Sequence, residues 1–65
     1  MRNRVSELRR QHRFSQQGLA ERLGVTRQTV ISIEKGRFCP SLPLAFQIAA
    51  EFQLPIEDIF YPDPR

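Results

Sequence analysis

The sequence predicts an all-α fold: a compact bundle of four helices, followed by a short fifth helical turn. Apolar residues recur at helical spacing in four segments, and no segment alternates between apolar and polar residues as a half-buried strand does. Ser15, Thr26 and Ser41 each stand just before such a segment, where a side-chain oxygen can accept a backbone N–H of the first turn. Gly24 and Gly36 stand where the second and third segments should end, because glycine readily takes the left-handed conformation of a helix end.

The first two helices follow from this spacing. The first is expected over residues 2–12, where inward side chains recur every three or four positions: Val5, Leu8 and His12. The second begins after Ser15, and Phe14 before that cap can pack against Leu19 in the fourth helical position. It ends at Gly24, and its buried face is expected to consist of Leu19, Ala20 and Leu23.

The third and fourth helices repeat the same arrangement of cap, apolar face and stop. The third begins after Thr26, ends at Gly36 and points two aliphatic side chains inward, Val30 and Ile33. The fourth begins after Ser41 and is the most apolar of all, with a buried face of Leu44, Ala45, Ile48, Ala49 and Phe52. The dipeptide Leu54-Pro55 breaks this helix, and a last short turn carries Ile56, Ile59 and Phe60.

These elements make one domain over residues 1–60, with a tail at 61–65 that is expected to fray. The lone Cys39 cannot form an internal disulfide, which fits a reducing cytoplasm. No apolar run approaches the roughly 20 residues of a membrane span, so we expect a soluble, cytoplasmic protein without a membrane partner. No metal site is expected, because Cys39 and His12 lack further ligands, and no other cofactor is indicated.

Charge is distributed unevenly along the chain. Residues 1–37 carry nine basic and three acidic side chains, a net charge of +6, whereas residues 38–65 carry one basic and four acidic ones, a net charge of −3. A basic half beside an acidic half suggests a polyanionic partner for the first half only. A solvated surface of mixed charge would give the same composition, so the charge alone leaves both interpretations open.

The segment from about residue 15 to residue 36 has the form of a helix-turn-helix. Two helices of about eight residues are joined by a tight turn at Gly24-Val25. The second of them turns Arg27, Gln28, Ser32 and Lys35 away from its buried face. Arginine pairs with guanine, glutamine with adenine and a serine hydroxyl with either base, and a helix fits the major groove in which these base edges are exposed. The outward face therefore predicts hydrogen-bond readout of duplex DNA.

The pattern "SQ..LA..LGV.R.T....E.G...PSL..A..IA" combines caps, core positions and outward polar positions in one register. In this pattern the chain resembles the lambda-repressor-like helix-turn-helix domains, of the Cro/repressor or XRE type, over residues 4–60. It is most similar to the short, single-domain bacterial members. The resemblance implies a transcriptional regulator that binds double-stranded DNA through the helix that begins after Thr26.

The resemblance also implies roles for individual residues. The base-reading residues would be Thr26, Arg27, Gln28 and Ser32. The phosphate-binding residues would be Gln16, Thr29, Lys35 and Arg37, and Gln16 would in addition brace Gln28. The family pairs an arginine of its first helix with a glutamate at the end of its third, here Arg9 with Glu34. Since both of these residues lie on faces that otherwise look buried, we expect a structural ion pair rather than a phosphate contact by Arg9.

One position of the third helix departs from the family pattern. Ile31 occupies a place that a small or polar residue often fills. Two interpretations are open: Ile31 is half-buried in the protein, or it touches a thymine methyl group.

The function expected from these features is sequence-specific DNA binding by a transcriptional regulator, a repressor that acts as a homodimer on a palindromic operator. The tentative dimer surface is the apolar carboxy-terminal stretch of Leu54, Pro55, Ile56, Phe60 and Tyr61. For Phe60 and Tyr61 a second interpretation is equally open, in which their rings cap the core. An alternative is an antitoxin-like or other protein-interaction module whose main partner is another protein. An enzyme is not expected, because the sequence lacks paired carboxylates, a nucleophile beside a base, and a phosphate-cradling loop. No small-molecule effector is evident.

Overall fold

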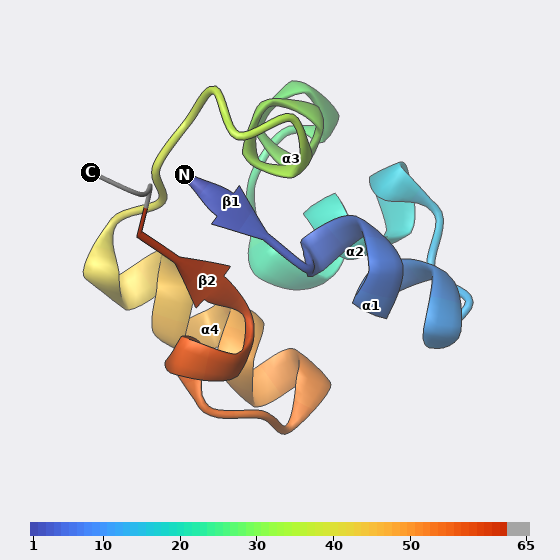
Figure 1. Cartoon of the computed structure of the whole chain (residues 1–65). Helices are drawn as coiled ribbons and strands as arrows, with labels where there is room; N and C mark the ends of the chain where they lie inside the picture. Colours follow the sequence, from blue (N-terminus) through green and yellow to red (C-terminus); the bar gives the residue numbers. More distant parts are fainter. Residues whose placement is uncertain (63–65) are drawn as a thin grey trace.

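The computed structural model describes residues 1–62, and over that range the fold is mainly helical (Figure 1). A short antiparallel ribbon joins the two ends of the described chain. The elements in order are β1 (Arg2–Asn3), α1 (Val5–Gln11), α2 (Gln16–Leu23), α3 (Arg27–Glu34), α4 (Leu42–Phe52), the 3-10 helix η1 (Ile56–Asp58) and β2 (Phe60–Tyr61). The predicted fold class, four helices followed by a short helical turn, is confirmed.

The ribbon is the feature that the sequence did not predict. Arg2 lies opposite Tyr61 and Asn3 lies opposite Phe60, and the amide of Arg4 donates to the carbonyl of Ile59 at 2.8 Å. The expectation of a first helix over about residues 2–12 was therefore wrong at its start, because α1 begins at Val5, while its end at Gln11 is one residue from the expected one. The expectation of a frayed tail was wrong for Tyr61, and residues 63–65 lie outside the described residues. A strand of two residues is too short to show any alternation, so no sequence pattern could reveal it.

The helix starts follow the predicted caps. The hydroxyl oxygen of Ser15 accepts the amide hydrogen of Gly18 at 2.9 Å, and that of Ser41 accepts the amide hydrogen of Leu44 at 3.3 Å. Thr26 caps α3 in the same way. Each cap satisfies one of the N–H groups that have no partner within the first helical turn.

The helix ends also follow from local conformation. Gly24 closes α2 with a φ of 72°, in the left-handed region that glycine enters without strain. At the end of α4 the same role falls to Gln53, with a φ of 57°. That helix ends at Phe52, just before the Leu54-Pro55 pair predicted to break it.

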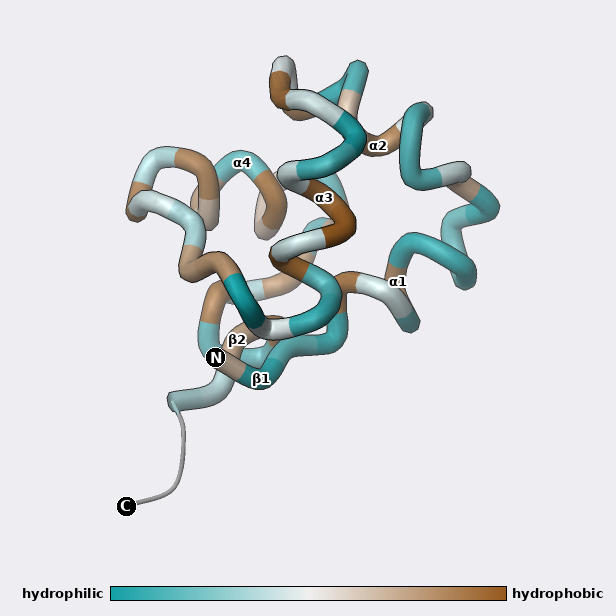
Figure 2. Tube along the Cα trace, turned by 90° about the horizontal axis from the view of Figure 1, so that it is seen from above, coloured by the Kyte–Doolittle hydropathy of each residue, from teal (hydrophilic) through white to brown (hydrophobic). Residues whose placement is uncertain are grey.

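The core lies where α1, α2, α3 and α4 meet, with η1 and β2 closing it. Hydrophilic and hydrophobic stretches alternate along the helices, as expected for helices that bury one face (Figure 2). Most of the predicted core residues are confirmed as buried. The buried apolar residues are Val5, Leu8, Leu19, Ala20, Leu23, Val30, Ile33, Ala45, Ile48, Ala49, Phe52, Ile59 and Phe60.

His12 and Leu44 differ from the sequence expectation. Leu44 is only half-buried, although it packs against the core. His12 is exposed, and its ring lies beside Phe14 and Phe52, with ring centroids 6.1 and 5.1 Å away. The imidazole therefore covers the edge of the core at the end of α1 rather than entering it.

A polar contact links α2 to α4 at the same edge. The guanidinium of Arg22 lies 5.0 Å from the centroid of the Phe14 ring, a cation–π geometry. Its Nε also forms an ion pair with the carboxylate of Glu51 on α4.

Within residues 1–62, no helix combines the length and the apolar character that crossing a bilayer would need.

Candidate nucleic-acid interface

Helix α3 packs on the core through one face and exposes the other. Val30 and Ile33 are almost completely buried, whereas Arg27 and Gln28 are exposed and Ser32 is half-exposed. These positions follow from the 3.6-residue period, because residues 28 and 32 lie one turn apart and opposite the two buried residues. The polar side chains predicted to point outward thus share one face of α3. The helix itself lies at one edge of the molecule (Figure 1).

The amino-terminal end of α3 is held by two threonines. The hydroxyl of Thr26 accepts the amide hydrogen of Thr29 at 3.2 Å, and the two hydroxyl oxygens lie 2.9 Å apart in a further hydrogen bond. Both side chains are therefore engaged with each other at the start of the helix. Thr26 remains exposed to solvent beside Arg27.

A buried carboxylate connects the first three helices. The Nε of Arg9 donates to Glu34 at 2.6 Å, and the side chains of these two residues are only 12% and 8% exposed. The Nε2 of Gln16 donates to the other carboxylate oxygen at 3.1 Å, and Arg9 also donates to the carbonyl of Phe14 at 2.9 Å. The structure thus contains the ion pair expected between Arg9 and Glu34.

The partner of Gln16 differs from the one that the family resemblance implied. Its amide is bonded to Glu34, not to Gln28, so it braces the end of α3 rather than a base-reading side chain. Gln16 is the first residue of α2 and is half-exposed. The carboxylate of Glu34 meanwhile has donors on both oxygens and faces two neighbouring helices.

The carboxy-terminal end of α3 is tied to the amino-terminal strand through Asn3. Its Nδ2 donates to the carbonyl of Ile33 at 2.8 Å, and its Oδ1 accepts the amide hydrogen of Val5 at 3.0 Å. The amino group of Met1 donates to the carbonyl of Gly36 at 3.0 Å. Sequence reasoning missed Asn3, and no signal could have found it, because its partner lies 30 residues away.

Two cationic residues follow α3 directly. Lys35 ends the helix and Arg37 lies in the next turn, and both are exposed. The amide of Arg37 donates to the carbonyl of Ser32 at 3.0 Å, which fixes this turn against the last residues of the helix. The turn thus brings two positive charges next to the polar face of α3.

Arg4, in contrast, belongs to the fold. Its guanidinium donates to Glu7 at 2.9 Å and to the carbonyl of Asp58 at 3.2 Å. The hydrogen bond and the charge of Glu7 raise the pKa of Arg4 above its ordinary value. Arg4 therefore stays charged and joins α1 to η1.

A helix capped by threonine, with a buried aliphatic side, a polar outer side and a preceding helix packed across it, is the arrangement of a DNA-reading unit. A helix-turn-helix family model matches residues 5–59. The chain belongs to the XRE/Cro-type helix-turn-helix family. The members of this family are DNA-binding transcriptional regulators and not enzymes.

Relatives of the chain occur in archaea as well as in bacteria. The chain is 53% identical over 60 residues to the uncharacterized HTH-type transcriptional regulator MJ0272 of Methanocaldococcus jannaschii. This match covers 92% of this chain and 91% of that protein. The chain is also 51% identical over 61 residues to the uncharacterized HTH-type transcriptional regulator YgzD of Bacillus subtilis, a match that covers 94% of this chain and 92% of YgzD. In structure the chain is similar to the restriction-modification controller protein C.AhdI from Aeromonas hydrophila, with a TM-score of 0.77 and 30% sequence identity. The match covers 88% of this chain and 83% of C.AhdI.

The residues that sequence reasoning assigned to a dimer surface do not all lie on the surface of this helix-turn-helix domain. Phe60 is only 7% exposed and belongs to the core, which is one of the two roles that the sequence left open for it. Leu54 and Ile56 are half-buried against the core, and Tyr61 is half-exposed with its hydroxyl 3.2 Å from the carbonyl of Asp58. The burial of Phe60 follows from the unpredicted ribbon, which fixes the end of the chain against β1.

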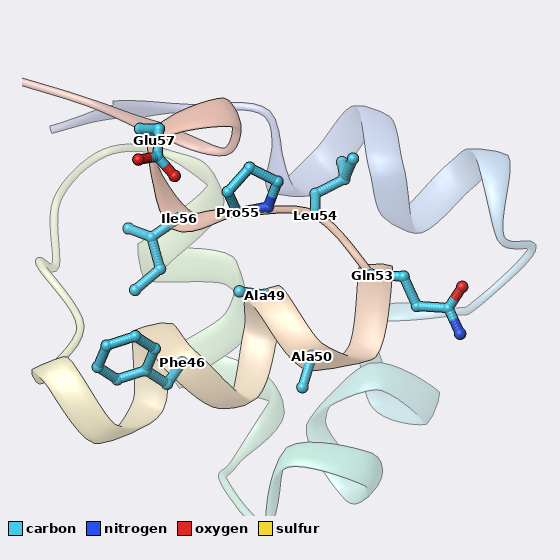
Figure 3. Close-up of a pocket in the computed structure, with 8 residues that line it drawn as sticks. All are labelled: Phe46, Ala49, Ala50, Gln53, Leu54, Pro55, Ile56 and Glu57. Carbon is cyan, nitrogen blue, oxygen red and sulfur yellow. The ribbon is translucent and has the colours of Figure 1, made fainter.

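Two large apolar side chains on α4 are exposed instead. Leu42 is 64% exposed and Phe46 is 57% exposed, and sequence reasoning missed both. Phe46 stands at one side of an open groove of about 660 Å³, and Ile56 points toward it from the segment after α4 (Figure 3). The groove is lined by Phe46, Ala49, Ala50, Gln53, Leu54, Pro55, Ile56 and Glu57.

Proposed function

We propose that this protein is a sequence-specific transcriptional repressor that binds a palindromic DNA operator as a homodimer, in the cytoplasm. Helix α3 enters the major groove, where Thr26, Arg27, Gln28 and Ser32 read base edges. The DNA backbone is bound by Gln16 at the start of α2 and by Thr29, Lys35 and Arg37 in and after α3. The Arg9–Glu34 pair has a structural role in this proposal, since it fixes the angle between the helices of the reading unit.

The observation that carries the proposal is the two-sided character of α3. Its inner side buries Val30 and Ile33, whereas its outer side exposes Arg27 and Gln28 without a hydrogen-bonding partner among residues 1–62. Donors and acceptors that the protein itself does not use are available for base edges. The cationic turn of Lys35 and Arg37 beside this face supplies attraction to phosphate that does not depend on sequence.

The proposal is tested by selecting preferred duplexes from a random pool and measuring their affinity against salt. We expect log K to fall with log[salt] by roughly 0.9 for each phosphate that the protein neutralises. Arg27→Ala and Gln28→Ala should each cost about 1–3 kcal/mol at the selected site and relax the preference at one base position.

Lys35→Ala and Arg37→Ala are the matched comparison. They should weaken binding to all duplexes alike and reduce the salt slope by about 1 each, because they contact phosphate. Binding that does not respond to salt, or identical behaviour of the two pairs of variants, would contradict the assignment. A promoter that overlaps the selected site should be silenced in a reporter strain if the protein is a repressor.

The homodimer follows from the size of the reading unit. A single recognition helix contacts only a few base pairs, too few to distinguish one site among the competing sequences of a genome. Twofold symmetry doubles the number of base pairs read and places two half-sites roughly 34 Å apart.

We assign the second copy to the groove of α4 and η1. Phe46 projects beside a hollow that the small side chains Ala49 and Ala50 leave open. A twofold axis through this face would place Phe46 of each copy in the hollow of the other, as an isologous interface requires. Of the residues expected at the dimer surface from the sequence, Leu54, Pro55 and Ile56 line the groove. Glu57 at its edge keeps this end of the molecule away from phosphate.

A further inference from the structure

Ile31 is an apolar side chain of α3 that lies outside the core. It is half-buried, and it is not one of the partly buried apolar residues that pack against the core, which are Phe14, Val25, Leu44, Leu54 and Ile56. Ile33, two positions later on the same helix, is 1% exposed. The two isoleucines of α3 therefore have different environments, and only Ile33 contributes to the core.

Helix geometry places Ile31 within the polar outer face. It follows Gln28 by three residues and Arg27 by four, and it precedes Lys35 by four, so it neighbours all three on the helix surface. At 100° per residue, Ile31 lies between Arg27 and Gln28 when α3 is viewed along its axis, one turn closer to its carboxy-terminal end. An aliphatic side chain thus lies among the groups proposed to read and bind DNA.

The apolar groove assigned to the second copy does not account for Ile31. That groove is lined by residues of α4 and of the segment after it, and none of its residues comes from α3. Figure 1 shows α3 at the opposite end of the molecule from η1. Whatever covers Ile31 must therefore approach the polar face of α3, where the proposed function places the major groove.

Among the groups that base edges present in the major groove, the apolar one is the C5 methyl of thymine. We infer that Ile31 contacts a thymine methyl in the operator and is a specificity-determining residue beside the hydrogen-bonding ones. A β-branched side chain in a helix has one strongly preferred χ1 rotamer, so its methyl groups are held in place before binding. This inference rests on the proposed function, since it requires α3 to enter the major groove.

The expected effect is that of covering one methyl group. Burying a group of that size contributes a factor of about four in affinity. Replacing the contacted thymine by deoxyuridine removes the methyl without changing a hydrogen bond of the base pair. The wild-type protein should therefore bind about fourfold more weakly when that one thymine is replaced, and the same should hold in the other half-site.

The experiment is a scan of the selected operator in which each thymine in turn becomes deoxyuridine. Affinities are measured for the wild type, Ile31→Val and Ile31→Ala. Ile31→Val keeps the branched carbon and should retain most of the effect, whereas Ile31→Ala should bind the thymine and deoxyuridine duplexes equally at that position. Thermal unfolding serves as the check on folding, because Ile31→Ala should melt close to the wild type while Ile33→Ala should not.

Two results would overturn the inference while leaving the proposed function intact. One is a wild type that binds tightly to a selected operator but responds to deoxyuridine at no position. The other is an Ile31→Ala variant that keeps the wild-type response at every position, which would assign the methyl contact to another side chain. Failure to select any preferred duplex would instead reject the proposed function itself.

Discussion

At the scale of single residues, the carboxylate of Glu34 joins three helices. It accepts hydrogen bonds from Arg9 of α1 and Gln16 of α2, and it lies at the end of α3. A buried charge is stable only when it is paired, and removing one member of such a pair leaves the other uncompensated. The role of Glu34 is therefore to fix the relative position of the helices that carry the proposed DNA contacts.

We predict that Glu34→Gln destabilises the protein by about 3 kcal/mol, because Arg9 stays buried without its counter-charge. Equilibrium urea unfolding measures the loss. Glu7→Gln is the control, since Glu7 forms an ion pair with Arg4 that is open to solvent, and such pairs contribute little. An unchanged stability together with tighter DNA binding would instead place Glu34 at the DNA surface.

The contacts and burial of single side chains could be predicted from the sequence to different extents. The Arg9–Glu34 pair was expected because both residues lie on faces that otherwise look buried and because the family resemblance implies the pair. The bond from Gln16 to Glu34 was not expected, since nothing in the spacing shows which of two nearby acceptors an amide chooses. Asn3 and Phe60 depend on contacts across the whole chain, and a local pattern cannot contain them.

At the scale of elements, the two glycine turns around α3 differ in what surrounds them. Gly24 and Gly36 have φ values of 72° and 74°, so both take the left-handed conformation. A Cβ at Gly24 would meet no atom within 4 Å, whereas one at Gly36 would lie 3.1 Å from the carbonyl oxygen of Met1. The turn after α3 is therefore closely packed against the amino-terminal strand.

We predict that Gly24→Ala costs about 1 kcal/mol, the strain of a left-handed non-glycine residue. Gly36→Ala should cost more, because the added methyl must displace Met1, which the Gly36 carbonyl also binds. Urea unfolding of the two variants measures the difference, and each serves as the control for the other. Equal losses in the free energy of unfolding would mean that Met1 shifts freely and does not help to hold the end of α3.

Helices were easier to predict than the ribbon for a physical reason. A capped helix has a local signal, a polar residue followed by a 3.6-residue apolar period, and Ser15, Thr26 and Ser41 all supplied it. The ribbon joins Arg2–Asn3 to Phe60–Tyr61, and its hydrogen bonds are long-range. It takes up residues 2 and 3, which the predicted first helix had included, and it holds Phe60 in the core.

At the scale of the whole molecule, two surfaces have different chemistry. Helix α3 carries the polar face and lies at one edge of the molecule (Figure 1), whereas the apolar groove beside Phe46 is lined by α4 and the segment that follows it. The charge difference between the two halves of the sequence predicted that only the first half, which contains α3, would favour a polyanion. The groove could not be predicted, because it forms where the segment after α4 packs back against that helix, and the apolar spacing within α4 does not contain this contact.

The groove leads to the prediction on assembly. We expect the wild type to sediment as a dimer at tens of micromolar, and Phe46→Ser to sediment as a folded monomer, because Phe46 is 57% exposed and the core does not depend on it. Phe38→Ser is the matched control, since Phe38 is 45% exposed and lies outside the groove. Analytical ultracentrifugation of the three proteins separates these outcomes, and circular dichroism confirms that each is folded.

The same variants link assembly to DNA binding. If two copies read a palindrome, Phe46→Ser should bind an isolated half-site as well as the wild type does, but should lose the gain that the wild type obtains from the second half-site. Changing the spacing of the half-sites away from one helical turn should remove that gain for the wild type. A wild type that remains monomeric and prefers an asymmetric single site would contradict the homodimer. The exposed groove would then require a different protein as its occupant.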